Sequence, residues 1–212
     1  MMNYKGYYWT LLAPLIKRSI AARYSKELAR QSIRQGKLEY RGLLERADDI
    51  GKGNPMAQNA YFAYVFVGAW LGSGKQIPPE GMAEVMTDVL HNMRFFFGLT
   101  NLNSKRGSKI WYKTMKKYEA WSADKLDKYP TTWRVGFDEN LHEDGSYYYF
   151  TSCPICSFCE KEGISEIMGP LCQTDKIMFQ MQHGVLHRDY TLAGGDSMCD
   201  YWIVGDQVKD PK

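Results

Sequence analysis

The segment WRVGFDENLHEDGSYYYFTS, residues 133–152, decides the fold class, because strand patterns replace helical ones there. Trp133, Val135 and Phe137 alternate with polar residues, which is typical of a half-buried strand. EDGS at 143–146 predicts a turn, and YYYFTS at 147–152 predicts a second strand. Helical spacing dominates before this segment, so helices and strands are segregated along the chain. This order predicts an α+β fold with an antiparallel sheet.

The region 1–126 is expected to form a helical half. Pro14 suits the first turn of a helix, and Gly36 suits its end. Asn54 and Pro79 mark the starts of two later helices. The first of these contains AYFAYVFVGAWL, residues 60–71, which is apolar on nearly every side and therefore central to the core. The expected helices cover 14–34, 37–47, 55–71, 79–93 and 106–122.

Residues 127–212 are expected to form a smaller half, with a sheet and two helices. Pro154 and Pro170 suit the first helical position, and Gly163 and Gly184 suit the ends. The expected helices are 154–162 and 170–183, and the later strands are 187–192 and 199–204. With 212 residues, the chain is expected to be one domain.

Composition excludes several classes of protein. Hydrophobic residues make up 44% and charged residues 24%, which favours a globular protein over a disordered one. The net charge of +3 gives no indication of nucleic-acid binding. No run of about 18 apolar residues is present, so no membrane partner is expected. The start of the chain lacks a signal-peptide cleavage pattern, so we expect a cytoplasmic protein. Homo-oligomer formation is left open.

The five cysteines all follow residue 152. In a reducing compartment such thiols are ligands, nucleophiles or buried apolar groups rather than disulfides. Cys153, Cys156, Cys159 and Cys172 together could hold zinc or an iron–sulfur cluster. No second CxxC or HxxxH completes a standard set, and packing alone can explain Cys156 or Cys159. We therefore expect no cofactor, with this metal site as the alternative.

Cys172 and Asp175 are the first candidates for chemistry. If Pro170 begins a helix, Cys172 lies in its first turn, where free N–H groups favour the thiolate. Asp175 shares that helical face and could orient a water or accept a proton. The alternative is that Asp175 is only a favourable acid in a first helical turn.

The closing segment HRDYTLAGGDSMCDYW, residues 187–202, supplies further candidates. His187 could serve as a base, although a hydrogen-bonded structural histidine fits equally. Arg188 could hold a carboxylate with its planar guanidinium, or lie on the surface. Gly194 and Gly195 permit positive φ, so the backbone there could approach a ligand closely.

These motifs resemble the L-2-amino-thiazoline-4-carboxylic acid hydrolase family over residues 150–204. The resemblance consists of a Cys-Pro, a Cys-x-x-Asp, an Arg-x-x-Thr-x-Ala-Gly-Gly stretch and a Cys-Asp-aromatic end. The matching residues are Cys153, Pro154, Cys172, Asp175, Arg188, Thr191, Ala193, Gly194, Gly195, Cys199 and Asp200. The two glycines fall one residue earlier than in the family pattern. The end of the chain is also similar to vinyl-reductase-type small-molecule-binding domains.

The resemblance implies a hydrolase that acts on the C–N bonds of a cyclic amidine. Its substrate would be a small C–N/C–S heterocycle with a carboxylate, such as a 2-aminothiazoline carboxylate, opened to an N-carbamoyl cysteine. The nucleophile would be the Cys172 thiolate, with Cys199 as its rival, or a water activated by a carboxylate. Asp175 or His187 would carry the proton. The residues expected to contact substrate are Cys153, Arg188, Thr191, Gly194 and Gly195. A non-catalytic small-molecule sensor with the same pocket is the alternative.

Overall fold

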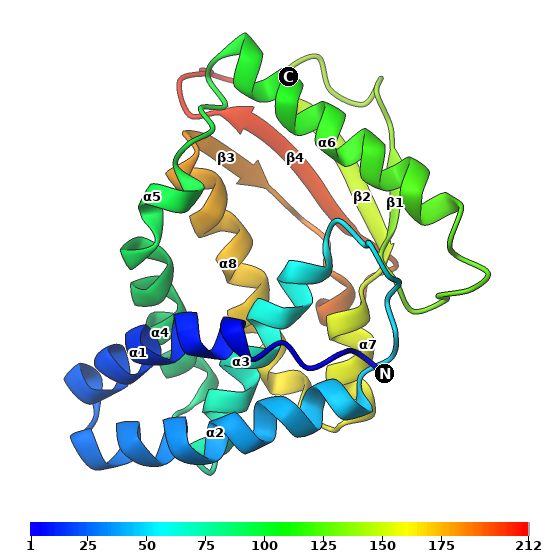
Figure 1. Cartoon of the computed structure of the whole chain (residues 1–212). Helices are drawn as coiled ribbons and strands as arrows, with labels where there is room; N and C mark the ends of the chain where they lie inside the picture. The colour runs from blue at the N-terminus through cyan, green and yellow to red at the C-terminus, as the bar shows by residue number, and fades with distance from the viewer. Residues whose placement is uncertain (212) are drawn as a thin grey trace.

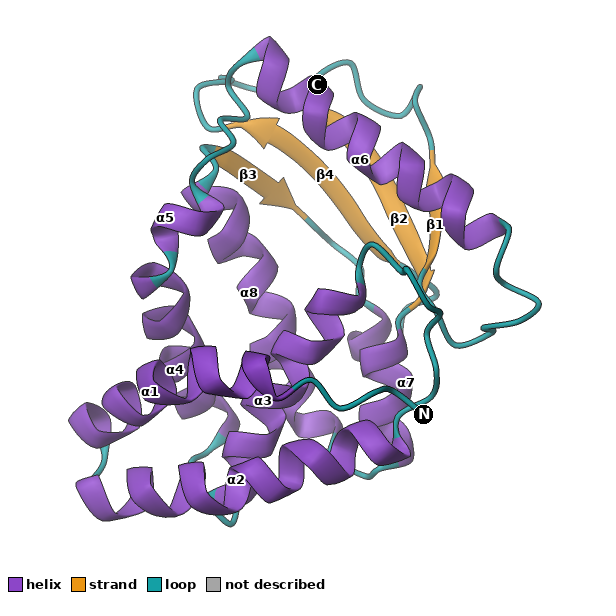
Figure 2. Ribbon diagram, viewed as in Figure 1, coloured by secondary structure: helices purple, strands orange, loops and turns teal. Residues whose placement is uncertain are grey.

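The computed structural model describes residues 1–211, without the side chains of residues 96 and 97. It confirms the α+β class, because six helices precede the first strand and two more lie between strands of one antiparallel sheet (Figures 1 and 2). The helices are α1 (Gly6–Arg23), α2 (Lys26–Arg46), α3 (Ala57–Gly72), α4 (Pro79–Asn92), α5 (Arg94–Phe97), α6 (Lys105–Ala123), α7 (Pro154–Lys161) and α8 (Met168–Met181). The strands are β1 (Arg134–Phe137), β2 (Ser146–Ser152), β3 (Gly184–His187) and β4 (Cys199–Gly205), and two 3₁₀ turns cover Ser165–Ile167 and Leu192–Gly194.

The first two helices differ from the sequence prediction. Helix α1 begins at Gly6, so Pro14 lies inside it rather than in its first turn. The helical structure is interrupted before α2, where Ser25 is the N-cap residue. The Ser25 hydroxyl accepts a hydrogen bond from the Leu28 N–H at 3.0 Å and so caps α2. The predicted end at Gly36 is also wrong, because this glycine lies in the middle of α2.

Gly36 lies where α2 and α3 cross at close range. A Cβ atom on Gly36 would lie 2.8 Å from the Gly68 carbonyl oxygen of α3. A Cβ atom on Gly72 would lie 2.3 Å from the Gly36 nitrogen and 2.5 Å from the Ser32 carbonyl oxygen. The glycines therefore allow two backbones to touch. As predicted, α3 is buried on nearly all sides at the centre of the helical half.

We expect Gly72→Ala to destabilise the protein by about 1–3 kcal/mol, because the added methyl group forces the two helices apart. The matched control is Gly169→Ala in α8, where a Cβ atom meets nothing within 4 Å. That variant should be neutral or slightly stabilising, because alanine favours the helix. Urea unfolding of both variants measures the difference, and equal stability would contradict a tight crossing.

The sheet has the strand order β1-β2-β4-β3, with all neighbours antiparallel. Helices α6 and α8 pack on one face, where Trp111 of α6 meets Phe179 of α8 with ring centroids 5.1 Å apart (Figure 1). Tyr148 and Tyr201 point from the strands toward these helices, with stacked rings 5.3 Å apart. Strand alternation places Trp202 on the opposite face. The Tyr201 side chain therefore lies on the face of the sheet that α6 and α8 cover.

Helix α8 and strand β3 also begin earlier than predicted. A 3₁₀ turn leads directly into α8 at Met168, and Pro170 takes the third helical position, where an N–H would have no partner within the helix. Gly184 begins β3 instead of ending α8. A Cβ atom on Gly184 would lie 2.5 Å from the Leu102 side chain. None of the helices in residues 1–211 has both the length and the apolar character that crossing a membrane requires.

Candidate active site

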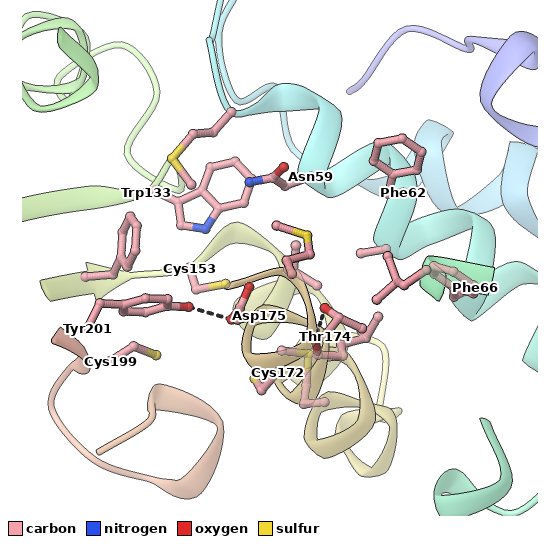
Figure 3. A pocket seen from close by; sticks show the side chains of 18 of the residues that line it. Asn59, Phe62, Phe66, Trp133, Cys153, Cys172, Thr174, Asp175, Cys199 and Tyr201 are labelled. Atoms are coloured by element: carbon pink, nitrogen blue, oxygen red, sulfur yellow. Dashed lines mark hydrogen bonds between the residues drawn. The ribbon is translucent and has the colours of Figure 1, made fainter. Parts of the chain in front are cut away.

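A cavity of about 150 Å³ lies between the helical half and the sheet. Its lining residues come from α1, α3, α4, α7, α8, β2, β4 and the connecting segments. Most of its wall is apolar, with Phe62 and Phe66 of α3 on one side. Tyr201 and Cys199 of β4 lie on the opposite side (Figure 3). The cavity therefore joins an apolar part to a part rich in sulfur and oxygen.

Three of the five cysteines line this cavity. Cys153 precedes α7 as its N-cap residue, Cys172 lies on α8, and Cys199 begins β4. The Cys199 sulfur accepts a hydrogen bond from the Leu192 N–H at 3.2 Å. Figure 3 shows the three sulfur-bearing side chains around Asp175. The structure thus brings Cys153, Cys172, Cys199 and Asp175 together.

Asp175 is held by a network of side chains from two other segments. Arg188 donates to its Oδ2 at 2.9 Å, and the Tyr201 hydroxyl donates to the same oxygen at 2.6 Å. Arg188 also donates to the Tyr201 hydroxyl at 3.2 Å and to the Cys172 carbonyl oxygen at 2.6 Å. Among residues 1–211, the Asp175 Oδ1 atom has no hydrogen-bond partner. The network fixes the carboxylate while one oxygen stays available to a ligand.

Burial shifts the pKa of Asp175. Loss of solvent raises the pKa of this carboxyl above its ordinary value, while Arg188 and the Tyr201 hydroxyl act in the opposite direction. The Arg188 side chain is only 5% exposed, whereas that of Asp175 is 29% exposed. Asp175 is therefore a partly accessible carboxylate of increased basicity, paired with a buried cation.

Cys172 does not lie in the first helical turn. Because α8 begins at Met168, Cys172 is the fifth helical residue, beyond the free N–H groups that were expected to favour its thiolate. Burial raises the pKa of the Cys172 thiol to about 12, and the charge of Asp175 adds to this effect. Arg188 opposes the shift only in part. The thiol of Cys172 is therefore protonated at neutral pH.

Cys156 and Cys159 lie outside the cavity. Cys159 is completely buried in the core, and Cys156 packs against the core from the same helix. This placement matches the packing explanation for both residues. In the part of the chain that the structure describes, no group of three or more His, Cys, Asp or Glu side chains is arranged to hold a metal ion.

Five of the predicted site residues do not line the cavity: His187, Arg188, Thr191, Gly194 and Gly195. The His187 ring packs against Trp202 on the far face of the sheet, with centroids 4.6 Å apart. The Thr191 hydroxyl accepts a hydrogen bond from the Gly194 N–H at 3.0 Å, and the Gly195 N–H bonds to the Leu192 carbonyl oxygen at 3.1 Å. The N–H groups of both glycines are therefore bonded within the turn that contains them.

Arg188 also differs from its expected role. It was predicted to hold the carboxylate of a substrate, but its guanidinium is already bonded to Asp175, Tyr201 and the Cys172 carbonyl, and it does not line the cavity. A buried cation needs a carboxylate partner, and Asp175 fills that need. Arg188 is thus a positioning residue for Asp175.

Several lining residues were missed by the sequence analysis. Tyr201 shares a strand face with Cys199, so alternation along β4 was a usable signal for it. Trp133 and Asn59 both line the cavity (Figure 3). No local signal identifies them, because a polar residue in a first helical turn and an apolar residue before a strand are both ordinary.

Comparison with known proteins identifies the family. The family model described as L-2-amino-thiazoline-4-carboxylic acid hydrolase matches residues 58–203. This range includes nearly all of α3 and most of β4, which supply opposite walls of the cavity. Neither the curated proteins nor the solved structures contain a match to the chain. Because the family model covers more than half of the sequence, the chain belongs to the L-2-amino-thiazoline-4-carboxylic acid hydrolase family.

Proposed function

We propose that the chain hydrolyses a small cyclic amidine of the 2-aminothiazoline type in this cavity, with Asp175 as the general base. The main support for this proposal is the orientation of the Asp175 carboxylate. Its Oδ2 atom is held by Arg188 and Tyr201, while its Oδ1 atom has no hydrogen-bond partner among the described residues. The name of the family supports the substrate class. A positioned carboxylate beside a small ligand cavity is suited to activating water.

The reaction adds one water to the ring. Asp175 removes a proton as the water oxygen forms a bond to C2, the carbon between the ring nitrogen and sulfur. The C=N electron pair moves to the ring nitrogen, which gains a proton from solvent. When the tetrahedral intermediate collapses, the C2–S bond breaks and the hydroxyl on C2 becomes a carbonyl. The leaving sulfur takes the proton held by Asp175, and the hydroxyl proton returns to solvent. The product carries a free thiol and a carbamoyl group.

A covalent route through Cys172 is the alternative chemistry for the same site. The raised pKa of the Cys172 thiol, about 12, means that a base must remove its proton before it can attack C2. Asp175 is the carboxylate on the same helix and in the same cavity. Both routes therefore depend on Asp175, whereas only the covalent route depends on Cys172.

Cys172→Ala distinguishes the two routes. If water is the nucleophile, we expect kcat/KM to stay within about tenfold of the wild-type value, a change of about 1.4 kcal/mol in the barrier. The control is Cys156→Ala on α7, which does not line the cavity. A loss beyond about 10³-fold for Cys172→Ala alone, with the fold intact, would assign the attack to the thiol.

The function itself is tested by incubating the purified chain with 2-aminothiazolines and following the product by mass. The expected product is heavier than the substrate by one water and carries a free thiol. Binding without turnover would instead support the sensor alternative, because such a domain retains the ligand unchanged. Absence of both binding and turnover would overturn the proposal.

A further inference from the structure

We propose that the substrate of this chain carries an apolar group where L-2-amino-thiazoline-4-carboxylate carries its carboxylate. This inference rests on the proposed hydrolysis and specifies its substrate class. It follows from the charges and shape of the cavity, which offers a place for an apolar substituent and no partner for an anion.

Asp175 is the only charged side chain among the described residues that line the cavity, and it is negative. Arg188 is hydrogen-bonded to Asp175, Tyr201 and the Cys172 carbonyl, its side chain is only 5% exposed, and it does not line the cavity. A substrate carboxylate in this cavity would lose its water without gaining a cation, and it would face the charge of Asp175. The cavity therefore disfavours an anionic substrate.

The end of the cavity opposite Tyr201 and Cys199 is lined by apolar side chains, and we call it the apolar arm. It is formed by Phe62 and Phe66 of α3, Val89 and Leu90 of α4, and Met93, which directly follows α4. Figure 3 shows Phe62 and Phe66 on the side away from Tyr201 and Cys199. A ligand whose amidine lies at Asp175 would direct a ring substituent toward this arm. Apolar surface buried there gains free energy, whereas a polar group does not.

The apolar arm and the reactive end also fit one molecule in size. The whole cavity has a volume of about 150 Å³, so it suits a single small heterocycle with a compact substituent rather than a long chain. A short branched alkyl group is the kind of substituent that this volume favours. The inferred class is thus a 2-aminothiazoline with one compact apolar substituent.

The test compares two probes on the wild-type protein, L-2-amino-thiazoline-4-carboxylate and a 2-aminothiazoline that bears an isobutyl group at the same ring position. We expect kcat/KM to favour the isobutyl probe by at least about tenfold, the scale on which a small apolar group is distinguished. Equal rates, or a preference for the carboxylate, would overturn the inference while leaving the hydrolase proposal standing.

A binding measurement separates failure of the inference from failure of the hydrolysis. If neither probe is hydrolysed, the hydrolase proposal fails, and calorimetric titration of both probes still decides the inference. Tighter binding of the isobutyl probe would support the apolar site, and tighter binding of the carboxylate, or no binding of either, would overturn it.

Two variants locate the preference in the apolar arm. Phe62→Ala removes a half-buried ring from the arm, so it should lower kcat/KM for the isobutyl probe by about tenfold or more and change the carboxylate probe little. Leu90→Lys places a cation in the arm and should shift the preference toward the carboxylate. Leu38→Ala, on the exposed face of α2, serves as the control. Equal effects of Phe62→Ala on both probes would contradict the assignment.

Discussion

Asp175→Asn is expected to lower kcat/KM by about 10²–10⁴-fold, the usual contribution of a positioned general base. The substitution keeps the size of the side chain and its ability to accept from the Tyr201 hydroxyl. It removes the charge that pairs with Arg188 and the basic oxygen that would take a proton from water. Initial rates at saturating and limiting substrate measure the loss.

The pH dependence of kcat/KM is an independent test of the role of Asp175. Because burial raises the pKa of Asp175, the fraction of ionised carboxylate increases through a range above the ordinary pKa of an aspartic acid. We therefore expect kcat/KM to rise with pH along an acidic limb whose midpoint lies above that ordinary value. The limb should disappear in Asp175→Asn.

Glu166→Gln is the matched control for Asp175→Asn. Glu166 lies just before α8 and pairs with Lys75 at the surface, with about two-fifths of each side chain exposed (43%). An exposed ion pair contributes little to stability, so this variant should keep both its rate and its pH limb. If Asp175→Asn keeps the wild-type rate as well, Asp175 is not the general base.

The elements of the fold that the sequence predicted correctly are those determined by local patterns. Strand β1 follows the alternation of apolar and polar residues, β2 contains the aromatic segment YYYFTS, and α4 begins at Pro79 as expected. The end of β3 depends instead on a distant side chain. The Asp200 carboxylate accepts hydrogen bonds from the N–H groups of Asp189 and Tyr190, so these residues leave the sheet that the sequence pattern would have continued.

Gly36 shows the same limit in the helical half. From local sequence a glycine after an amphipathic stretch indicates a helix end. In the structure, position 36 requires a glycine because Gly68 and Gly72 of another helix approach it closely. The role of Gly36 comes from contacts between two different helices. Such contacts cannot be read from the local sequence of one chain.

The part of the candidate site that lies on a single helix could be predicted from the sequence. Cys172 and Asp175 are three residues apart on α8, and both line the cavity. His187 and Arg188 are neighbours in the sequence but have different surroundings, since His187 packs against Trp202 and Arg188 bonds to Asp175. The pairing of Arg188 with Asp175 could not be predicted, because helix packing rather than spacing brings the two segments together.

Arg188→Met is expected to destabilise the protein by about 3–5 kcal/mol, because it leaves the Asp175 carboxylate without its cation. The Arg188 side chain is only 5% exposed, and it ties α8 to the segment after β3 through Asp175 and the Cys172 carbonyl. Methionine fills similar space without charge. Urea unfolding at neutral pH measures the loss.

The control is Arg46→Met. Arg46 pairs with Glu162 at 2.7 Å, but its side chain is 48% exposed, so the pair should contribute at most about 1 kcal/mol. A similar loss of stability in both variants would mean that Arg188 contributes only as an ordinary surface arginine does. Arg188→Lys, which keeps the charge with fewer donors, should lie between wild type and Arg188→Met.

The pH profile then separates positioning from simple stabilisation. The charge of Arg188 favours the ionised form of Asp175 and so lowers the pKa of that carboxyl against the effect of burial. Removing the charge raises this pKa further, so the acidic limb of kcat/KM should move to higher pH in Arg188→Met and stay near its wild-type position in Arg188→Lys. A purely structural arginine would change stability without moving the limb. A limb that stays in place in Arg188→Met would therefore show that Arg188 does not set the ionisation of Asp175.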